Sequence, residues 1–435
     1  MKIQKVFLRT YGCSFNLADS QKINEILAKL NLHTTTEDKA DLIIINTCAV
    51  KSNTEQKIIS YLKKLNENNK DVIITGCLPF ISKKTFVKVK SSIPNYVAII
   101  HPMHIGYIEG IIEEYDTKKI RGTVINDSAL LKVEKSQILI KNQDSPIGIL
   151  QISEGCLGKC SFCATKNARG NFKAFPLENL KKQIDIYLIS KKKEIWLTAQ
   201  DCGIIDTDSK NFFELCKYLS ERPEIFFVRI GMMNPEHIKN NLDKFLEIFQ
   251  SNKFFKFLHI PIQSASNKIL NLMNRKYTRE DLELIFQSIK EKIPNLTIAT
   301  DIIVGFPQED KYDFQETLQF LEKIKPDVIN ISKFSMRSGT IAKKFKPLDS
   351  IEIKERSKKA TNLVSEICFE KNKQWIGWEG PLILDEKGKN LSIMGRNPNY
   401  KCVVLNNGTI GEIRNVKIIA AEKNYCLGEV INNKQ

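Results

Sequence analysis

The sequence predicts an α/β protein with three folded parts: an N-terminal α/β domain on a parallel sheet, a partial (βα)6 barrel, and a small all-β barrel at the C-terminal end. Runs of β-branched residues alternate with stretches of helical length in two separate series, which predicts the first two parts. After about residue 371 the pattern changes to short strands between turns, which predicts the third part. A length of 435 residues agrees with roughly three domains.

Composition limits the class of protein. Hydrophobic residues make up 42% of the chain, which is enough to form packed cores. No apolar run approaches the ~20 residues that span a bilayer, and the first residues show no signal-peptide pattern. We therefore expect a cytoplasmic monomer with no membrane partner.

The charge and the cysteines are more specific. A net charge of +16, from 66 Lys and Arg against 50 Asp and Glu, favours a polyanion as partner. The alternative is a lysine-rich background without a particular partner. Eleven cysteines in a chain without an export signal indicate metal binding, redox chemistry or catalysis rather than disulfides.

Three strands of the N-terminal domain each lead to one cysteine. The expected strands and their cysteines are residues 5–10 with Cys13, residues 41–48 with Cys48, and residues 71–77 with Cys77. Because ligands collect at the carboxyl ends of parallel strands, thiolates there can converge on one metal ion or cluster. Three separate buried thiols are the alternative.

The remaining elements set the predicted boundaries. The segments are an N-terminal domain at 1–130, a connector at 131–146, a βα barrel at 147–370 and a β-barrel at 371–435. The βα barrel has expected strands at 147–152, 194–198, 225–230, 255–260, 296–304 and 328–331. The C-terminal barrel has expected strands at 382–384, 401–405, 412–418 and 429–431. Six βα units predict an incomplete barrel rather than the eightfold one.

A second set of cysteines follows the first strand of the βα barrel. Cys156, Cys160 and Cys163 have the spacing Cys-x3-Cys-x2-Cys, which can bind three irons of a [4Fe–4S] cluster and leave the fourth open. Gly155 and Gly158 allow the backbone to fold tightly around a cluster. Structural zinc is the alternative, but it needs four protein ligands, and the five histidines form no suitable pair.

This motif after the first strand of a βα barrel resembles the signature of radical S-adenosylmethionine (SAM) enzymes. The three upstream cysteines make the chain similar to the methylthiotransferases, whose N-terminal domain holds a second [4Fe–4S] cluster. The C-terminal barrel resembles their RNA-binding TRAM domain. The resemblance covers the whole chain and implies two [4Fe–4S] clusters, on Cys13, Cys48 and Cys77 and on Cys156, Cys160 and Cys163.

Several segments resemble the archaeal and eukaryotic subgroup that acts on N6-threonylcarbamoyladenosine in tRNA. These segments are residues 10–20, 155–163, 168–170, 195–201, 259–264 and 300–307. The chain departs from that subgroup at residues 203–206, 264–266 and 335–340. The alternatives are methylthiotransferases for isopentenyladenosine in tRNA or for a ribosomal protein aspartate, and a non-catalytic RNA-binding protein with structural metal.

The resemblance implies that a methylthio group is placed on C2 of the adenine at tRNA position 37. That C–H bond is not acidic, so a general base does not suffice, whereas a cofactor-derived radical does. The resemblance implies SAM as both methyl donor and radical source. The expected partners are the tRNA anticodon arm, an electron donor and a sulfur source.

Other candidate residues are assigned from their positions at strand ends or in basic groups. The candidates for SAM binding are Phe162, Gln200, Asp201, Gln263, Ser264, Asp301 and Gly305. The candidates for RNA binding are Arg337, Arg396, Tyr400 and Lys401. Basic and aromatic side chains together suit unpaired RNA. Cluster shielding by Phe162, ordinary loop hydrogen bonds and a solvated barrel surface are the alternatives.

Overall fold

The computed structural model describes residues 3–126, 134–141, 144–204 and 210–431. Residues 131–133 and 142–143 of the predicted connector, residues 205–206 of one subgroup departure, and residues 432–435 lie outside the described residues. The chain forms two compact units. Unit 1 comprises Met1–Gln143, Ile149–Ile186 and Ser335–Lys344, and unit 2 comprises Asp144–Gly148, Tyr187–Phe334 and Phe345–Gln435. Unit 1 therefore contains both cysteine sets.

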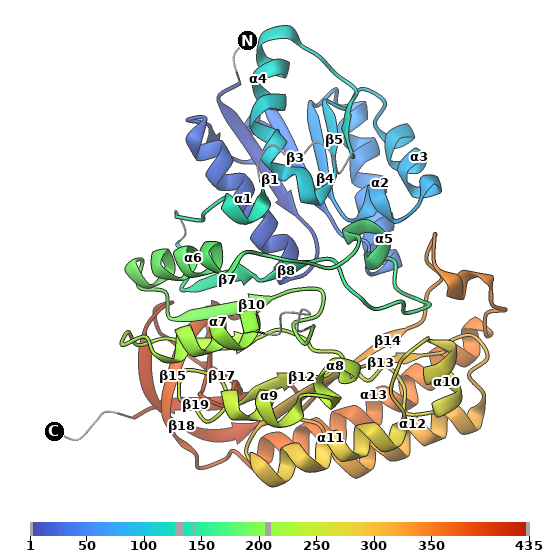
Figure 1. Ribbon diagram of the computed structural model, residues 1–435, viewed down its shortest axis with the longest axis vertical. Helices are drawn as coiled ribbons and strands as arrows, with labels where there is room; N and C mark the ends of the chain where they lie inside the picture. Colours follow the sequence, from blue (N-terminus) through green and yellow to red (C-terminus); the bar gives the residue numbers. More distant parts are fainter. Residues whose placement is uncertain (1–2, 127–133, 142–143, 205–209, 432–435) are drawn as a thin grey trace. The chain divides into compact units, whose positions relative to one another are not determined.

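Unit 1 is built on a six-stranded parallel sheet with the order β2-β1-β3-β4-β5-β6. Its strands β1, β3, β4 and β5 lie side by side in Figure 1. Its strands are β1 (Lys5–Thr10), β2 (His33–Thr34), β3 (Leu42–Thr47), β4 (Val72–Gly76), β5 (Ala98–Ile100) and β6 (Thr123–Ile125). Its first helices are α1 (Ser14–Lys29), α2 (Ser52–Glu67), α3 (Lys83–Ser92) and α4 (Ile108–Lys118). β3 and β4 are buried throughout, as the apolar sequence runs predict.

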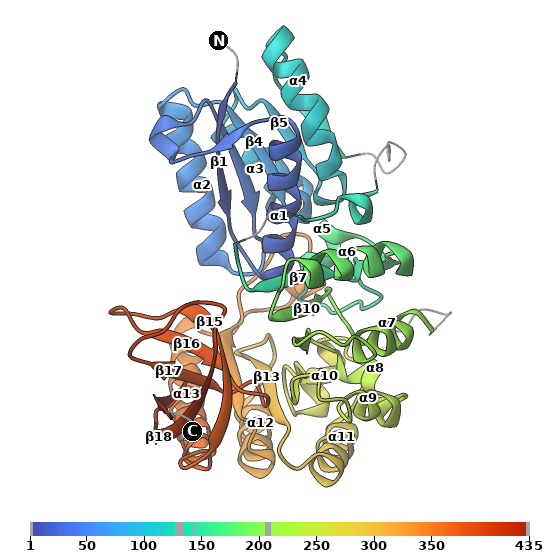
Figure 2. The same cartoon turned by 90° about the vertical axis from the view of Figure 1, so that its left-hand side faces the viewer.

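Helices cover both faces of this sheet (Figure 2). Ile43 and Ile45 of β3 pack with α2 and α3, whereas Leu42 and Ile44 pack with α1 and α4. This alternation follows from the two-residue period of a strand. The two apolar layers fix the orientation of β1, β3 and β4, whose carboxyl ends bear the first cysteine set.

The second part of unit 1 surrounds the second cysteine set. Its elements are β8 (Ser153–Glu154), α5 (Thr165–Arg169), β9 (Lys173–Ala174) and α6 (Leu177–Ile189), which runs past the unit boundary. β8 and β9 pair antiparallel and close the chain between them into a loop. We call Ser335–Lys344, which returns to unit 1 from unit 2, the strap.

Unit 2 contains the rest of the βα series. Within unit 2, β10 pairs parallel with β11, the strands β12, β13 and β14 form a parallel sheet, and a parallel bridge joins Val228 to Phe254. The strands are β7 (Ile147–Gln151), which ends in unit 1, β10 (Glu194–Thr198), β11 (Phe227–Ile230), β12 (Phe257–His259), β13 (Thr297–Val304) and β14 (Val328–Lys333). The helices are α7 (Lys210–Ser220), α8 (Pro235–Lys239), α9 (Leu242–Ile248), α10 (Asn267–Leu272), α11 (Arg279–Lys292), α12 (Lys311–Ile324) and α13 (Ser350–Lys373). All six predicted strands are present.

The C-terminal part of unit 2 is a closed five-stranded barrel, so the predicted fold class is confirmed. Its strands are β15 (Glu379–Lys387), β16 (Ile393–Arg396), β17 (Cys402–Leu405), β18 (Ile413–Ala421) and β19 (Cys426–Val430). Leu382, Val403 and Val416 fill its interior. α13 packs against both β14 and β18 and so connects the barrel to the βα sheet. No helix among the described residues is long and apolar enough to cross a membrane.

Candidate active site

The first cysteine set lies at one edge of the unit 1 sheet. Cys13 directly precedes α1, and Cys48 and Cys77 directly follow β3 and β4. The Cys77 amide donates to the carbonyl of Thr47, which places Cys77 beside Cys48. Gly12 has a φ of +119°, and a side chain there would lie 3.1 Å from the Cys48 Cβ atom. The three cysteines are therefore neighbours, as the strand pattern predicts.

The electrostatics of this set also show their proximity. Burial raises the pKa of Cys77 to about 11, the Arg169 guanidinium opposes that increase, and the thiols of Cys13 and Cys48 add to it. Burial likewise raises the pKa of Cys48. A thiolate at either buried position therefore needs positive charge beside it, which an iron cluster supplies.

The second cysteine set lies in the loop between β8 and β9. The amide of Gly158 donates to the Cys156 Sγ atom at 3.2 Å, and the amide of Cys163 donates to the Cys160 carbonyl at 3.2 Å. A Cβ atom on Gly158 would lie 3.3 Å from the Cys156 Sγ atom and 3.7 Å from that of Cys160. The loop thus folds back on itself and gathers its thiols.

Both sets fit a cluster better than a single metal ion. Among the described residues, no three or more Cys, His, Asp or Glu side chains converge closely enough to hold one ion. In a [4Fe–4S] cluster each thiolate binds a different iron, so the thiols need only surround a common space. Each set offers three thiols on residues that lie close to one another, as a cluster with one open iron requires.

A buried network of four charges lies between the two cysteine sets. Lys135 pairs with Asp19 and, at 2.7 Å, with Glu154. Arg169 pairs with the same carboxylates at 2.8 Å and 2.7 Å. Burial favours a raised pKa for Asp19, but Arg169 and Lys135 outweigh it and lower that pKa. The network therefore holds two cations against two anions in a site without water contact.

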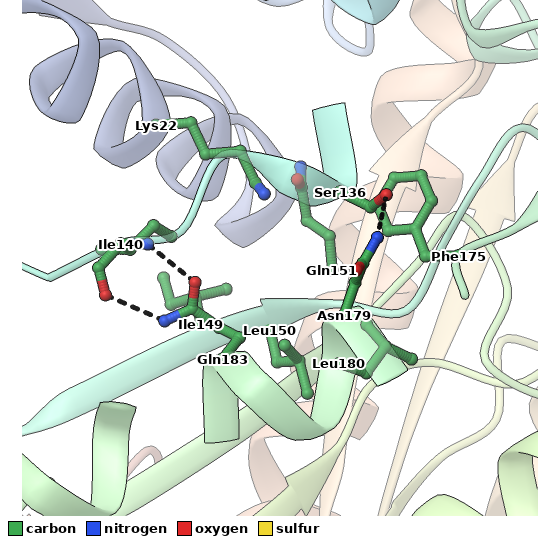
Figure 3. Close-up of a pocket in the computed structure, with 10 residues that line it drawn as sticks. All are labelled: Lys22, Ser136, Ile140, Ile149, Leu150, Gln151, Phe175, Asn179, Leu180 and Gln183. Carbon is green, nitrogen blue, oxygen red and sulfur yellow. Dashed lines mark hydrogen bonds between the residues drawn. The ribbon is translucent and has the colours of Figure 1, made fainter. Parts of the chain in front are cut away.

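A small cavity adjoins this network (Figure 3). Gln183 bonds the Ile140 backbone across it, and Asn179 donates to Ser136. Its accessible volume of about 10 Å³ is far below the roughly 300–1,000 Å³ of ligand pockets. These bonds fasten residues 134–141 to α6, so the cavity belongs to the scaffold of the site.

Two carboxylates of unit 2 each pair with one histidine. Asp201, after β10, accepts from the amides of Gly203 and Asn234 and pairs with His237 at 2.9 Å. Asp301, on β13, pairs with His259 at 3.0 Å. Sequence reasoning considered these histidines only as zinc ligands. His259 ends β12, which was an available signal, whereas His237 lies in α8.

The other SAM candidates differ in whether their polar atoms already have hydrogen-bond partners within the protein. The Gln200 Oε1 atom is buried and has no hydrogen-bond partner among the described residues, which fits a missing cofactor contact. Gln263 has a φ of +68°, and its backbone N–H donates to the backbone carbonyl of Asp301. The hydroxyl of Ser264 instead bonds Thr317 of α12. The Gly305 amide donates to Glu309.

Phe162 of unit 1 is half-buried in the second cysteine loop. The structure therefore places Gln200 and Asp201 after β10, Gln263 after β12 and Asp301 within β13, all in unit 2, and it places Phe162 with the unit 1 cysteines.

The RNA candidates are not an exposed surface. Arg337 is 5% exposed and pairs with Glu55 of α2 at 3.0 Å. Lys401 is 4% exposed and pairs with Asp327 at 2.8 Å. Burial therefore gives no support to the RNA-binding assignment of either side chain.

Arg396 and Tyr400 are also engaged inside unit 2. Arg396 lies 3.9 Å from Asp385, and Tyr400 packs between Phe255 and Phe257 with ring centroids 4.9 Å and 4.6 Å away. The sequence placed basic and aromatic residues together, but packing of the C-terminal barrel on the βα sheet uses them.

Comparisons with known proteins agree with this architecture. Family models match residues 5–97 (uncharacterized protein family UPF0004), 150–321 (radical SAM superfamily) and 379–431 (TRAM domain). A solved radical S-adenosylmethionine methyltransferase from Kitasatospora setae shares the fold, with a TM-score of 0.56, 12% identity, and 78% of this chain and 77% of that chain covered.

Curated relatives match almost the whole chain. The probable threonylcarbamoyladenosine tRNA methylthiotransferase of Pyrococcus abyssi is 36% identical over 98% of this chain and 100% of its own length. The threonylcarbamoyladenosine tRNA methylthiotransferase of Drosophila melanogaster is 30% identical over 99% of this chain and 78% of its own length. The chain therefore belongs to the threonylcarbamoyladenosine tRNA methylthiotransferase family of radical SAM proteins.

Proposed function

We propose that this protein converts N6-threonylcarbamoyladenosine at position 37 of tRNA to its 2-methylthio derivative. The observation that supports this best is the presence of two three-cysteine sets in one compact unit. The reaction needs both a radical source and a sulfur donor near one base. The full-length relatives named for this activity support the choice of substrate.

Cys156, Cys160 and Cys163 would hold one [4Fe–4S] cluster and leave its fourth iron open. When bound there with SAM, this cluster supplies the electron that generates a carbon radical able to abstract an unactivated hydrogen. Gly155 and Gly158 let the loop close tightly enough to gather the three thiols. Phe162 would shield the cluster or contact the SAM adenine.

The other cluster would be held by the first cysteine set, Cys13, Cys48 and Cys77. It would supply the site for the transferred sulfur. Burial of Cys48 and Cys77 excludes water from that side, whereas Cys13 is exposed and leaves an approach for substrate. The buried Gln200 oxygen and the carboxylates of Asp201 and Asp301 would contact SAM, with His237 and His259 fixing the carboxylate orientation.

The partners follow from this chemistry. The anticodon loop of tRNA presents its base already unpaired, so extruding it costs less than from a duplex. The +16 charge favours this polyanion. An electron donor and a sulfur source are also needed, and we expect a monomer acting in the cytoplasm.

Anaerobic reconstitution tests this function. We expect about eight irons per chain, SAM cleavage under dithionite and methylthiolation of threonylcarbamoyladenosine-containing tRNA. Cys160→Ala should abolish SAM cleavage, while Cys48→Ala should retain some cleavage but lose methylthiolation. Cys216→Ala, at a buried cysteine of α7, is the matched control and should retain both.

The alternatives predict different results. Bound zinc with fewer than about four irons would support the non-catalytic RNA-binding protein and overturn the enzyme. Nucleoside mass spectrometry of tRNA from a deletion strain distinguishes the substrates. Persistence of the methylthio-threonylcarbamoyl nucleoside there would exclude this substrate and leave isopentenyladenosine or a ribosomal protein aspartate.

A further inference from the structure

Arg169 has contacts that its place in the sequence does not explain. Its side chain is 1% exposed, and its guanidinium bonds three parts of unit 1. Nε donates to the Cys77 Sγ atom at 3.2 Å, Nη1 to Glu154 at 2.7 Å, and Nη2 to Asp19 at 2.8 Å. One planar group thus touches a member of the first cysteine set and fixes the residue two positions before Cys156.

The backbone beside Arg169 is equally close to the second cysteine set. The amide of Cys156 donates to the Gly170 carbonyl at 3.4 Å. Gly155 has a φ of +72°, and a Cβ atom there would lie 2.0 Å from the Asn171 carbonyl oxygen. Only glycine allows this approach, so the chain after Arg169 and the chain before Cys156 form one packed pair.

Stability alone does not explain the buried charges around Arg169. Buried ion pairs often give no net stability over apolar residues of the same volume. Lys135 alone would leave Asp19 and Glu154 with one cation for two carboxylates. A cation aimed at a thiol is, however, what an iron-bound thiolate needs, since hydrogen bonds to sulfur and local charge set cluster potentials.

We propose that Arg169 is a positioning residue that holds Cys77 and the Cys156 loop in one frame and raises the reduction potential of the cluster on Cys13, Cys48 and Cys77. This proposal rests on the proposed function, which assigns a cluster to the first cysteine set. Reduction adds negative charge to a cluster, so the Nε–H donor and the positive charge stabilise the reduced form.

The test uses full-length protein with a single cluster. Cys156→Ala, Cys160→Ala and Cys163→Ala together remove the second cysteine set and leave the first. The protein is reconstituted anaerobically, and its midpoint potential is measured by redox titration followed by electron paramagnetic resonance.

Substitutions of Arg169 are then added to this background. We expect Arg169→Gln to shift the midpoint to a more negative potential. The lysine of Arg169→Lys keeps the positive charge, but its single ammonium group cannot bond all three partners as the planar guanidinium does. We therefore expect a smaller shift of the midpoint potential than with Gln. Arg121→Gln is the control, because Arg121 pairs with Asp71 elsewhere in unit 1 and should leave the potential unchanged.

The outcomes separate the two proposals. If the protein without the second cysteine set binds no cluster, the proposed cluster on Cys13, Cys48 and Cys77 is wrong. If it binds a cluster whose potential is the same with Arg, Lys or Gln at position 169, the inference about Arg169 is wrong. Should the Gln variant fail to load iron, the Arg169→Lys shift decides the question. Thermal unfolding without iron shows how much each variant changes the scaffold.

Discussion

At the scale of single residues, burial decides what the charged side chains do. Arg169, Lys135 and Lys401 are each buried against carboxylates. Their charge is neutralised locally and contributes little to attraction of a distant polyanion. Burial also raises the pKa of three carboxyl groups of unit 2, those of Glu194, Glu309 and Asp385.

The first residue-scale prediction concerns pH. Burial, with help from nearby Asp385, raises the pKa of Glu194 to about 8. The folded protein therefore holds a proton that the unfolded chain releases at lower pH. Stability from this group is complete below the ordinary carboxyl pKa and is lost as pH rises towards about 8. Glu194→Gln should flatten this part of the curve of melting temperature against pH. An unchanged curve in that variant would show that Glu194 is ionised in the folded protein.

A second residue-scale prediction concerns the buried pair of Lys401 and Asp327. Lys401→Met leaves the Asp327 carboxylate without its cation, which should cost about 3–5 kcal/mol of unfolding free energy. Denaturant unfolding measures it. Adding Asp327→Asn should recover much of the loss, because no buried charge then remains. Lys417→Met, at an exposed pair with Glu379, should have little effect. Equal losses at both lysines would refute this account.

At the scale of elements, the strap shows how distant segments fix the cysteine loops. The Ala342 amide donates to the Ser161 carbonyl, between Cys160 and Cys163. Asn167 Nδ2 donates to the carbonyl of Gly339, and Arg337 pairs with α2. The strap thus contacts the second cysteine loop directly. In the C-terminal barrel, one strand escaped the sequence prediction: β16 is short and contains Gly395, whose missing side chain lets β15 approach closely.

An element-scale prediction follows for Gly339. Its φ is +82°, and a Cβ atom would lie 2.4 Å from the Ile81 carbonyl oxygen, so Gly339→Ala should displace the strap. Amide hydrogen exchange in residues 156–163 should then become faster. Gly377→Ala has a similar φ of +88° but open space around it, and it serves as the control for backbone strain alone. Equal exchange in both variants would contradict an anchoring role of the strap.

At the scale of the whole molecule, the charge remains the main indication of an RNA partner. The four residues first assigned to RNA are engaged in internal contacts, so the +16 charge must act through other basic side chains. Lysines are scattered along the chain rather than gathered in one segment. This scatter agrees with the alternative that part of the charge is a lysine-rich background.

The whole-molecule prediction concerns salt. The logarithm of the association constant for tRNA should fall linearly with the logarithm of salt concentration, with a slope of several units. Each phosphate that a Lys or Arg neutralises contributes about −0.7 to −0.9 to this slope. Filter binding or anisotropy at a series of salt concentrations measures the slope. A slope near zero would show that the surplus charge does not contact the tRNA.

The sequence by itself determined the family, the order of the three parts and the two cysteine sets. Strand periodicity and ligand spacing are local properties, and the Cys-x3-Cys-x2-Cys spacing already requires a tight loop. The convergence of Cys13, Cys48 and Cys77 also followed from the sequence, because parallel strands place their carboxyl ends at one edge.

Only the tertiary structure decided which charges meet and which are buried. Arg169 and Cys77 are 92 positions apart, and no local pattern joins them. Tyr400 and Lys401 lie beside basic residues in the sequence, yet packing against β12 and Asp327 removes them from solvent. Burial and ion pairing depend on the surfaces that long-range packing brings together. Sequence patterns, in contrast, reflect neighbours along the chain.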